Sequence, residues 1–228
     1  MASPFNKSNT FDLTHEVMST YEMGYLYPNC LMEVVPGDTF DVRSEATSRF
    51  EAMIAPQMSR IDKYQYWFYI PNRVLFADWE KYITGGLDGT DTTVPPYMTS
   101  PSGGYAIGSL ADHLGIPTGV AGLKHSALPF RMYAKVMNDW FFDENLDTMF
   151  VENTASGSDT TTNTSLQKKR WEKDYFTNSL PTPQRGGASY IPLSTSCPVV
   201  SNGKALGLTD GTNTKYLGYG STGATETG

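Results

Sequence analysis

Residues 61–73 read IDKYQYWFYIPNR, and this stretch bears most directly on the fold. Its central seven residues, YQYWFYI, include five rings. A strand with one face in water alternates apolar and polar side chains. Here Tyr66 and Phe68 fall on one face of an extended chain, while Trp67 and Tyr69 fall on the other. The pattern predicts a strand covered on both faces, with the rings of Trp67 and Tyr69 largely inaccessible to water.

Further strand-like segments precede this aromatic run. The stretch CLMEVVPGDTFDV, residues 30–42, gives two of them, separated by a Pro-Gly-Asp turn. Partial alternation of apolar and polar residues continues over residues 39–56. Short strands separated by turns indicate a sandwich or a barrel. We therefore expect the first strands of a β fold within residues 25–76, after a polar N-terminal arm at residues 1–24.

Residues 77–170 have a different composition, rich in Gly, Pro, Thr and Asp, and are expected to form a long insertion. A short helix is predicted near residues 109–114, because Ser109 and Asp112 have the spacing of a capping pair. A longer helix is predicted near residues 126–145, where apolar residues recur at helical spacing.

The apolar stripe of the longer helix must lie on another apolar surface. We predict that one face of the aromatic run packs beneath it and that the other face meets an opposite sheet. The residues expected in this packing are Tyr66, Trp67, Phe68, Tyr69, Phe130, Tyr133, Met137, Trp140 and Phe141.

The C-terminal part adds few strand candidates. Residues 171–200 are expected to return to the barrel, and residues 201–228 are rich in Gly, Thr, Ser and Asn and are expected to be flexible. Four or five strand candidates can be counted in all, whereas a closed jelly roll has eight. We therefore expect a mainly β fold that is incomplete in this chain.

The acidic composition limits the possible functions. The net charge is −7 and the isoelectric point is about 4.9, which argues against a protein that coats nucleic acid by its overall charge. No apolar segment resembles an export signal or a membrane span, so synthesis in a cytoplasm is expected. Cys30 and Cys197 fit no zinc or redox spacing, and they either pair through the fold or remain free thiols.

The sequence also lacks the patterns of an enzyme. The histidines His15, His113 and His125 do not have metal-site spacing, and no nucleotide-binding or nucleophile motif is present. We therefore expect no catalytic residue, no metal and no cofactor.

A segment that mixes basic and aromatic residues follows the polar loop at residues 152–166. Cations interleaved with rings hold single strands by contacting phosphates and stacking on bases. The alternative is a solvated charge run beside a strand whose rings belong to the core. The candidates for contact with DNA are Lys168, Lys169, Arg170, Trp171 and Lys173.

Six segments occur in the order found in the major capsid proteins of the Microviridae, and the chain most resembles the gokushovirus-like members of that family. The segments are FDLTHE, VVPGDTF, YWFYIPNRVLFADWEKYI, GSLADHLGIPTGV, ALPFRMYAKVMNDWFFDENL and KDYFTNSLPTPQRG, within roughly residues 11–195. The resemblance implies a viral jelly roll with long loop and helical insertions. It also implies that this chain is the N-terminal half of the family's chain and that a variable surface insertion starts near Ser201.

The same resemblance implies a structural role. Copies of the protein would self-assemble into a T=1 icosahedral shell around a single-stranded DNA genome, in the cytoplasm of a bacterial host. The implied partners are other copies of the chain, the genome, minor virion proteins and a host cell-surface receptor. The rival interpretation is a jelly-roll carbohydrate-binding module that uses its surface aromatic residues.

Overall fold

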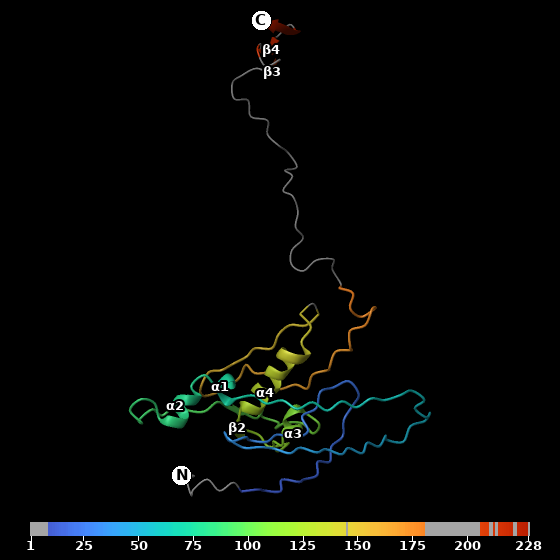
Figure 1. The fold of residues 1–228 in the computed structure, drawn as a ribbon, viewed down its shortest axis with the longest axis vertical. Helices are drawn as coiled ribbons and strands as arrows, with labels where there is room; N and C mark the ends of the chain where they lie inside the picture. Colours follow the sequence, from blue (N-terminus) through green and yellow to red (C-terminus); the bar gives the residue numbers. More distant parts are fainter. Residues whose placement is uncertain are drawn as a thin grey trace, which may run out of the picture. The chain divides into compact units, whose positions relative to one another are not determined.

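The computed structural model describes residues 9–144, 146–180, 206–209, 212, 214–220 and 223–227. The backbone forms two compact units, Met1–Pro181 and Thr182–Gly228. Among its described residues, the first unit contains short helices and a two-stranded sheet, and the second contains a three-stranded sheet (Figure 1).

Helix α4, Leu128–Val136, runs through the middle of the first unit and continues into a π-helical turn, η1, Met137–Phe141 (Figure 1). Pro129 lies in its first turn, where a missing N–H costs no helical hydrogen bond. Phe142 is extended and ends the helix. The structure therefore has a helix inside the predicted range 126–145, but helical structure stops at Phe141.

Helix α3, Leu110–His113, packs against α4. Its N-cap is Ser109, whose Oγ accepts a hydrogen bond from the backbone N–H of Asp112 at 3.4 Å. The predicted N-cap is thus present, whereas the Asp112 carboxylate accepts the backbone N–H of Gly108, at 2.7 Å, instead of that of Ser109. The core is built from buried residues of both helices, of the positions that flank α4 and of the strand β1, Tyr97–Thr99: Met98, Leu110, Ala111, Ala127, Phe130, Tyr133 and Met137.

The two-stranded sheet frames this core. Strands β1, Tyr97–Thr99, and β2, Lys124–Ser126, pair antiparallel with Met98 opposite His125. The loop between them folds back on itself, so that Gly104 lies against the backbone of Gly119. This close approach leaves no room for a Cβ at Gly104.

Two short helices follow the aromatic run directly. They are α1, Asn72–Leu75, and α2, Trp79–Thr84, and α1 contacts α4. Phe76, between them, is fully buried, and Gly85 ends α2 in the left-handed conformation with φ at 73°. Helices of four and six residues are too short to show a clear helical period, which is why the sequence did not predict them.

The strands expected before and within the aromatic run do not form a sheet in the described part of the chain. Residues 26–70 are drawn in Figure 1 as long traces without strands. The backbone of residues 39–70 makes no hydrogen bond to the backbone of another described residue. The run has the residues of a strand, but a strand requires a neighbour to pair with.

The two faces of the aromatic run have different surroundings. Tyr66 and Phe68 contact Phe141 and Trp140 at the end of the long helix, with ring centroids 5.3–6.1 Å apart. On the other face, Trp67 is 53% exposed and Tyr69 is 72% exposed. The predicted burial of these two rings is therefore wrong for the described chain, because the described residues leave that face largely uncovered.

The second unit is an antiparallel meander. Strand β4, Thr214–Gly220, pairs with β3, Leu206–Thr209, on one side and with β5, Gly223–Thr227, on the other. The sequence had predicted a flexible segment here, and the Thr, Tyr and Leu residues among the glycines favour strands. Cys197 and most of the predicted return to the barrel lie outside the described residues. No helix in the described ranges is long and apolar enough to span a membrane.

Candidate interaction surface

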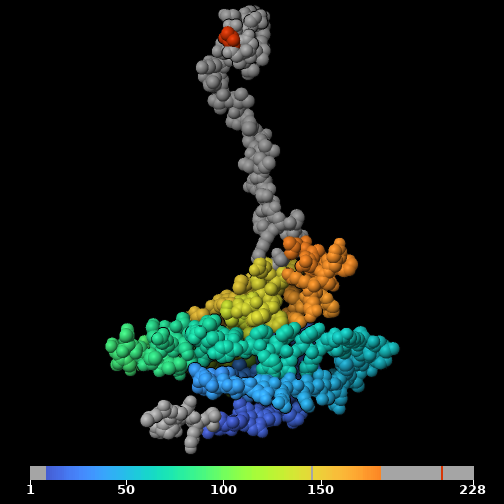
Figure 2. Space-filling view, viewed as in Figure 1, coloured from blue at the N-terminus to red at the C-terminus, as the bar shows by residue number. Residues whose placement is uncertain are grey.

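Three segments of the first unit surround one hollow of about 530 Å³. Its lining, here called the aromatic–basic hollow, comes from residues 66–68, 140–143 and 169–173. Figure 2 shows the orange surface near residue 170 lying beside the yellow surface near residue 140. Four of the five DNA-contact candidates therefore line a single site together with residues of the aromatic run: Lys169, Arg170, Trp171 and Lys173.

Tryptophans are concentrated in this hollow. Trp67, Trp140 and Trp171 line it, and the chain has four tryptophans in all. Trp171 is 80% exposed, and Trp140 is largely exposed although its ring contacts Phe68 at 5.7 Å. Exposed tryptophan faces suit stacking on bases or sugars and are typical of protein contact surfaces.

The basic residues lie on a segment fixed by backbone pairing, here called the basic strap, residues 167–173. The strap runs antiparallel to the chain near Tyr25: Leu26 N–H donates to Gln167 O at 2.9 Å, and Lys169 N–H donates to Gly24 O at 2.8 Å. Two segments far apart in sequence are thereby held side by side.

Tyr133 of α4 links these two segments through its hydroxyl group. Its hydroxyl donates to Leu26 O at 3.0 Å and accepts from Gln167 N–H at 2.9 Å. Burial raises the pKa of Tyr133 to about 12, more than the hydrogen bond from Gln167 lowers it. The phenol therefore stays neutral, and its hydroxyl can donate the hydrogen bond to Leu26 O.

The cations at the C-terminal end of the strap are bound by carboxylates. Arg170 contacts both carboxylate oxygens of Asp147, with Nε 3.0 Å from Oδ2. Lys173 Nζ lies 3.2 Å from Asp143 Oδ2. Asp147 Oδ2 also accepts the backbone N–H of Asp143 at 3.2 Å, which links the two acids in one turn.

The two lysines at the other end are bound chiefly by rings. Lys169 Nζ donates to Tyr66 Oη at 2.8 Å and lies 4.7 Å from the centre of the Tyr64 ring. A carboxylate oxygen of Glu172 is 3.9 Å away. Lys168 Nζ lies 5.0 Å from the centre of the Tyr25 ring. Each predicted DNA-contact cation thus has a partner within the chain, and contact with DNA stays a prediction.

The polar loop at residues 152–166 carries a buried ion pair that the sequence did not reveal. Arg131 Nε of α4 lies 2.8 Å from Asp159 Oδ2, and both side chains are almost fully buried. Arg131 also donates to Leu75 O and Ala155 O, each at 2.9 Å. The guanidinium therefore joins α4 to α1 and to the loop.

Asp159 receives further hydrogen bonds within its loop. Thr162 Oγ1 donates to Oδ2 at 2.7 Å, and the backbone N–H groups of Thr161 and Thr162 donate to Oδ1 at 3.1 Å. Burial alone would raise the pKa of Asp159, but the hydrogen bonds from Thr162, Arg131 and the backbone outweigh it and hold the pKa well below its ordinary value. An aspartate followed by threonines, as in SDTTT, is the local sequence signal that could have indicated this turn.

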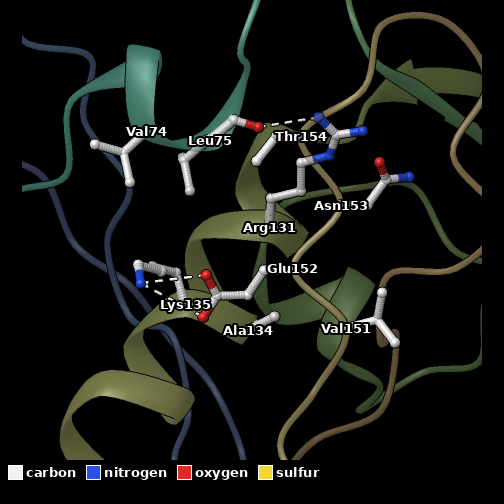
Figure 3. Close-up of a pocket in the computed structure, with 9 residues that line it drawn as sticks. All are labelled: Val74, Leu75, Arg131, Ala134, Lys135, Val151, Glu152, Asn153 and Thr154. Atoms are coloured by element: carbon white, nitrogen blue, oxygen red, sulfur yellow. Dashed lines mark hydrogen bonds and ion pairs between the residues drawn. The ribbon is translucent and has the colours of Figure 1, made fainter.

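A small cavity lies beside this pair, where α1, α4 and residues 151–154 pack together. Figure 3 shows Arg131 reaching the carbonyl of Leu75 and Lys135 reaching Glu152 across it. Its volume is about 10 Å³, enough for one water molecule at most. Nearby, the Asn138 side chain exchanges two hydrogen bonds of 3.0 Å with the backbone of Phe150, which fixes the chain just before this loop to η1.

The histidines have separate partners. His15 Nε2 lies 3.6 Å from Cys30 Sγ, His113 Nδ1 lies 3.2 Å from Ser19 Oγ, and His125 Nε2 lies 3.0 Å from Tyr105 Oη. Within the described ranges, no group of three or more His, Cys, Asp or Glu residues is placed to hold a metal ion.

Exposed tryptophans beside partnered cations are typical of a protein surface that contacts other macromolecules. Comparison with known proteins identifies the family of this chain. Residues 3–225 match the phage capsid protein (F protein) family, and the chain belongs to this family.

Three relatives are each named capsid protein VP1. The chain is 35% identical to that of Bdellovibrio phage phiMH2K over 191 residues, 34% identical to that of Chlamydia phage 1 over 211 residues and 32% identical to that of Spiroplasma virus 4 over 203 residues. The alignments cover 82–83% of this chain but only 35–37% of the relatives, so the matched region spans about a third of their length. The resemblance to Microviridae capsid proteins is confirmed.

Proposed function

We propose that this chain is part of the shell subunit of a small single-stranded DNA phage, and that its copies self-assemble into a closed T=1 icosahedral capsid. One observation carries the proposal: the segment 39–70 exposes large apolar side chains, among them Ile54, Trp67 and Tyr69, on a backbone without hydrogen-bonded partners in the described chain. A surface of this kind needs to be covered.

A shell subunit covers such a surface in two ways. Strands from the remainder of a longer family chain complete a viral jelly roll, with one sheet meeting the face of Trp67 and Tyr69 and the helical insertion covering the opposite face. Neighbouring subunits cover the remaining apolar surface, through contacts that are individually of ordinary size and that symmetry repeats over the whole shell. The two-sided apolar pattern of residues 64–70 and the greater length of the relatives support this arrangement.

The basic strap faces the inside of the shell in this proposal. Lys168, Lys169, Arg170 and Lys173 contact phosphates of the genome, and Trp171 offers a face for an unpaired base. The segment from Ser201 begins a surface insertion that meets the host receptor, and minor virion proteins complete the particle. The mature protein resides in the virion, after assembly in the bacterial cytoplasm.

Electron microscopy of the full-length protein, expressed alone and with the phage's other structural proteins, tests the proposal. Closed shells of one size are expected. A monomer that never assembles under either condition would contradict it.

The exposed rings of Trp67, Tyr69 and Trp171 also favour a second candidate, a jelly-roll carbohydrate-binding module. Glycan-array binding by a stable monomer, abolished by Trp67→Ala or Trp171→Ala, would support that function. Shell formation without glycan binding would support the first.

A further inference from the structure

We propose that Asp143 and Asp147 mask the basic strap, and that single-stranded nucleic acid binds there by displacing their carboxylates from Lys173 and Arg170. The inference rests on the proposed contact between the strap and the genome and adds how that contact is regulated.

The carboxylates are the fixed side of these pairs. The side chains of Asp143 and Asp147 are 11% and 23% exposed, whereas those of Lys173 and Arg170 are about half exposed. The backbone N–H of Asp147 donates to Asp143 O at 2.8 Å, and Asp143 N–H donates to Asp147 Oδ2, so the turn holds both acids in place. The long basic side chains reach down to the acids from the surface and can swing away to a competing anion.

The acids largely cancel the charge of the strap. Its four cations face three carboxylates, since Glu172 also lies near Lys169. A nearly neutral surface attracts a polyanion only weakly from a distance. The masked strap therefore favours ligands that also gain from stacking on the exposed rings of Trp140 and Trp171, namely strands with unpaired bases.

A phosphodiester is a suitable replacement for the carboxylates. Arg170 already binds Asp147 through two nitrogens, and a phosphate offers two oxygens to the same fork. On exchange, the ion pairs with the acids break, pairs with phosphate form, and the two freed carboxylates become accessible to solvent and salt. The displacement costs binding energy, so removing the acids should tighten binding.

The double variant Asp143→Asn/Asp147→Asn tests this in the whole chain. Its matched control is Asp41→Asn/Asp62→Asn, which removes the same charge from two exposed ion pairs with Arg43 and Arg60. Binding of a fluorescent oligothymidylate is measured by anisotropy at about 50 and 200 mM NaCl. We expect the first variant to bind roughly 5- to 30-fold more tightly than wild type at the lower salt concentration, and the control to change little. Equal tightening by both variants, or none by the first, would overturn the inference.

A measurement on the wild-type chain avoids any effect of substitution on folding. Carbodiimide-coupled amine labelling, read by mass spectrometry, reports the accessibility of each carboxylate. Saturation with the oligonucleotide should increase labelling of Asp143 and Asp147 and leave that of Asp41 and Asp62 unchanged. Unchanged or decreased labelling of the first two would overturn the exchange.

The inference and the proposed function fail in different ways. If neither wild type nor variant binds the oligonucleotide, the inference and the genome contact are both wrong, while shell formation is still judged by microscopy. If wild type binds but the acids have no effect, only the masking is wrong.

Discussion

Arg131 and Asp159 form a buried ion pair with 2.8 Å between Nε and Oδ2, and this pair fastens the polar loop at residues 152–166 to helix α4. The remaining guanidinium nitrogens donate to backbone carbonyls of Leu75 and Ala155, and Asp159 accepts four hydrogen bonds from Thr161 and Thr162. Every charged atom of the pair is thus bound to protein. Such a pair is costly to break from one side, because the other charge remains buried.

Asp159→Asn should therefore destabilise the chain by about 3–5 kcal/mol, measured by urea denaturation at neutral pH. The exposed pair of Arg60 with Asp62 provides the control, and Asp62→Asn should cost less than about 1 kcal/mol. Similar losses of unfolding free energy in the two variants would show that burial of Arg131 and Asp159 does not add to the stability of the chain.

The same carboxylate should make the free energy of unfolding depend on pH. The folded chain holds the pKa of Asp159 below the unfolded value, which is about 3.9. Its contribution is therefore complete above about pH 4 and is lost as the pH falls below that value. The difference in unfolding free energy between wild type and Asp159→Asn should shrink from pH 7 to pH 3, and a constant difference would contradict the assignment.

Tyr133→Phe should loosen the basic strap from the segment near Leu26, which the two backbone hydrogen bonds between them continue to hold. It removes one hydroxyl that serves both Leu26 O and Gln167 N–H, at a cost of about 1–3 kcal/mol. In this variant the Gln167 amide should exchange hydrogen faster than in wild type, and the thermal stability should be lower. Tyr175, whose ring is exposed, gives the control, since Tyr175→Phe should change stability by less than about 0.5 kcal/mol.

Two glycines with nearly equal φ angles separate conformational strain from steric clash. Gly104 and Gly108 have φ of 72° and 75°, but a Cβ at Gly104 would overlap the backbone of Gly119 and Val120, while one at Gly108 meets nothing within 4 Å. Gly108→Ala should cost roughly 1–2 kcal/mol from strain alone, and Gly104→Ala clearly more. Thermal unfolding compares the two variants. Equal losses of stability would show that the loop accommodates a Cβ at Gly104 without an energetic penalty.

The features that the sequence predicted are local ones. Ser109 and Asp112 are three residues apart, and the apolar spacing around Phe130 is set within one helix, so each could be recognised from neighbouring residues alone. The pair of Arg131 with Asp159 joins residues 28 apart, and the hollow gathers three separate segments, which no local pattern specifies. Burial of Trp67 and Tyr69 was predicted wrongly for the described chain because their pattern shows that both faces need cover without showing which chain supplies it.

The strength of the genome contact can be tested in particles. Lys168→Ala/Lys169→Ala/Arg170→Ala should still form shells, because the backbone pairing near Tyr25 and the Tyr133 bridge remain. Packaged DNA should be released at lower salt, since each lost phosphate contact reduces the salt slope by about 0.7. Arg43→Ala/Arg49→Ala/Arg60→Ala removes the same charge from exposed positions outside the hollow and is the matched control. Release at the same salt concentration in wild type and the first variant would reject the contact, whereas a matching shift in the control would assign it to overall charge.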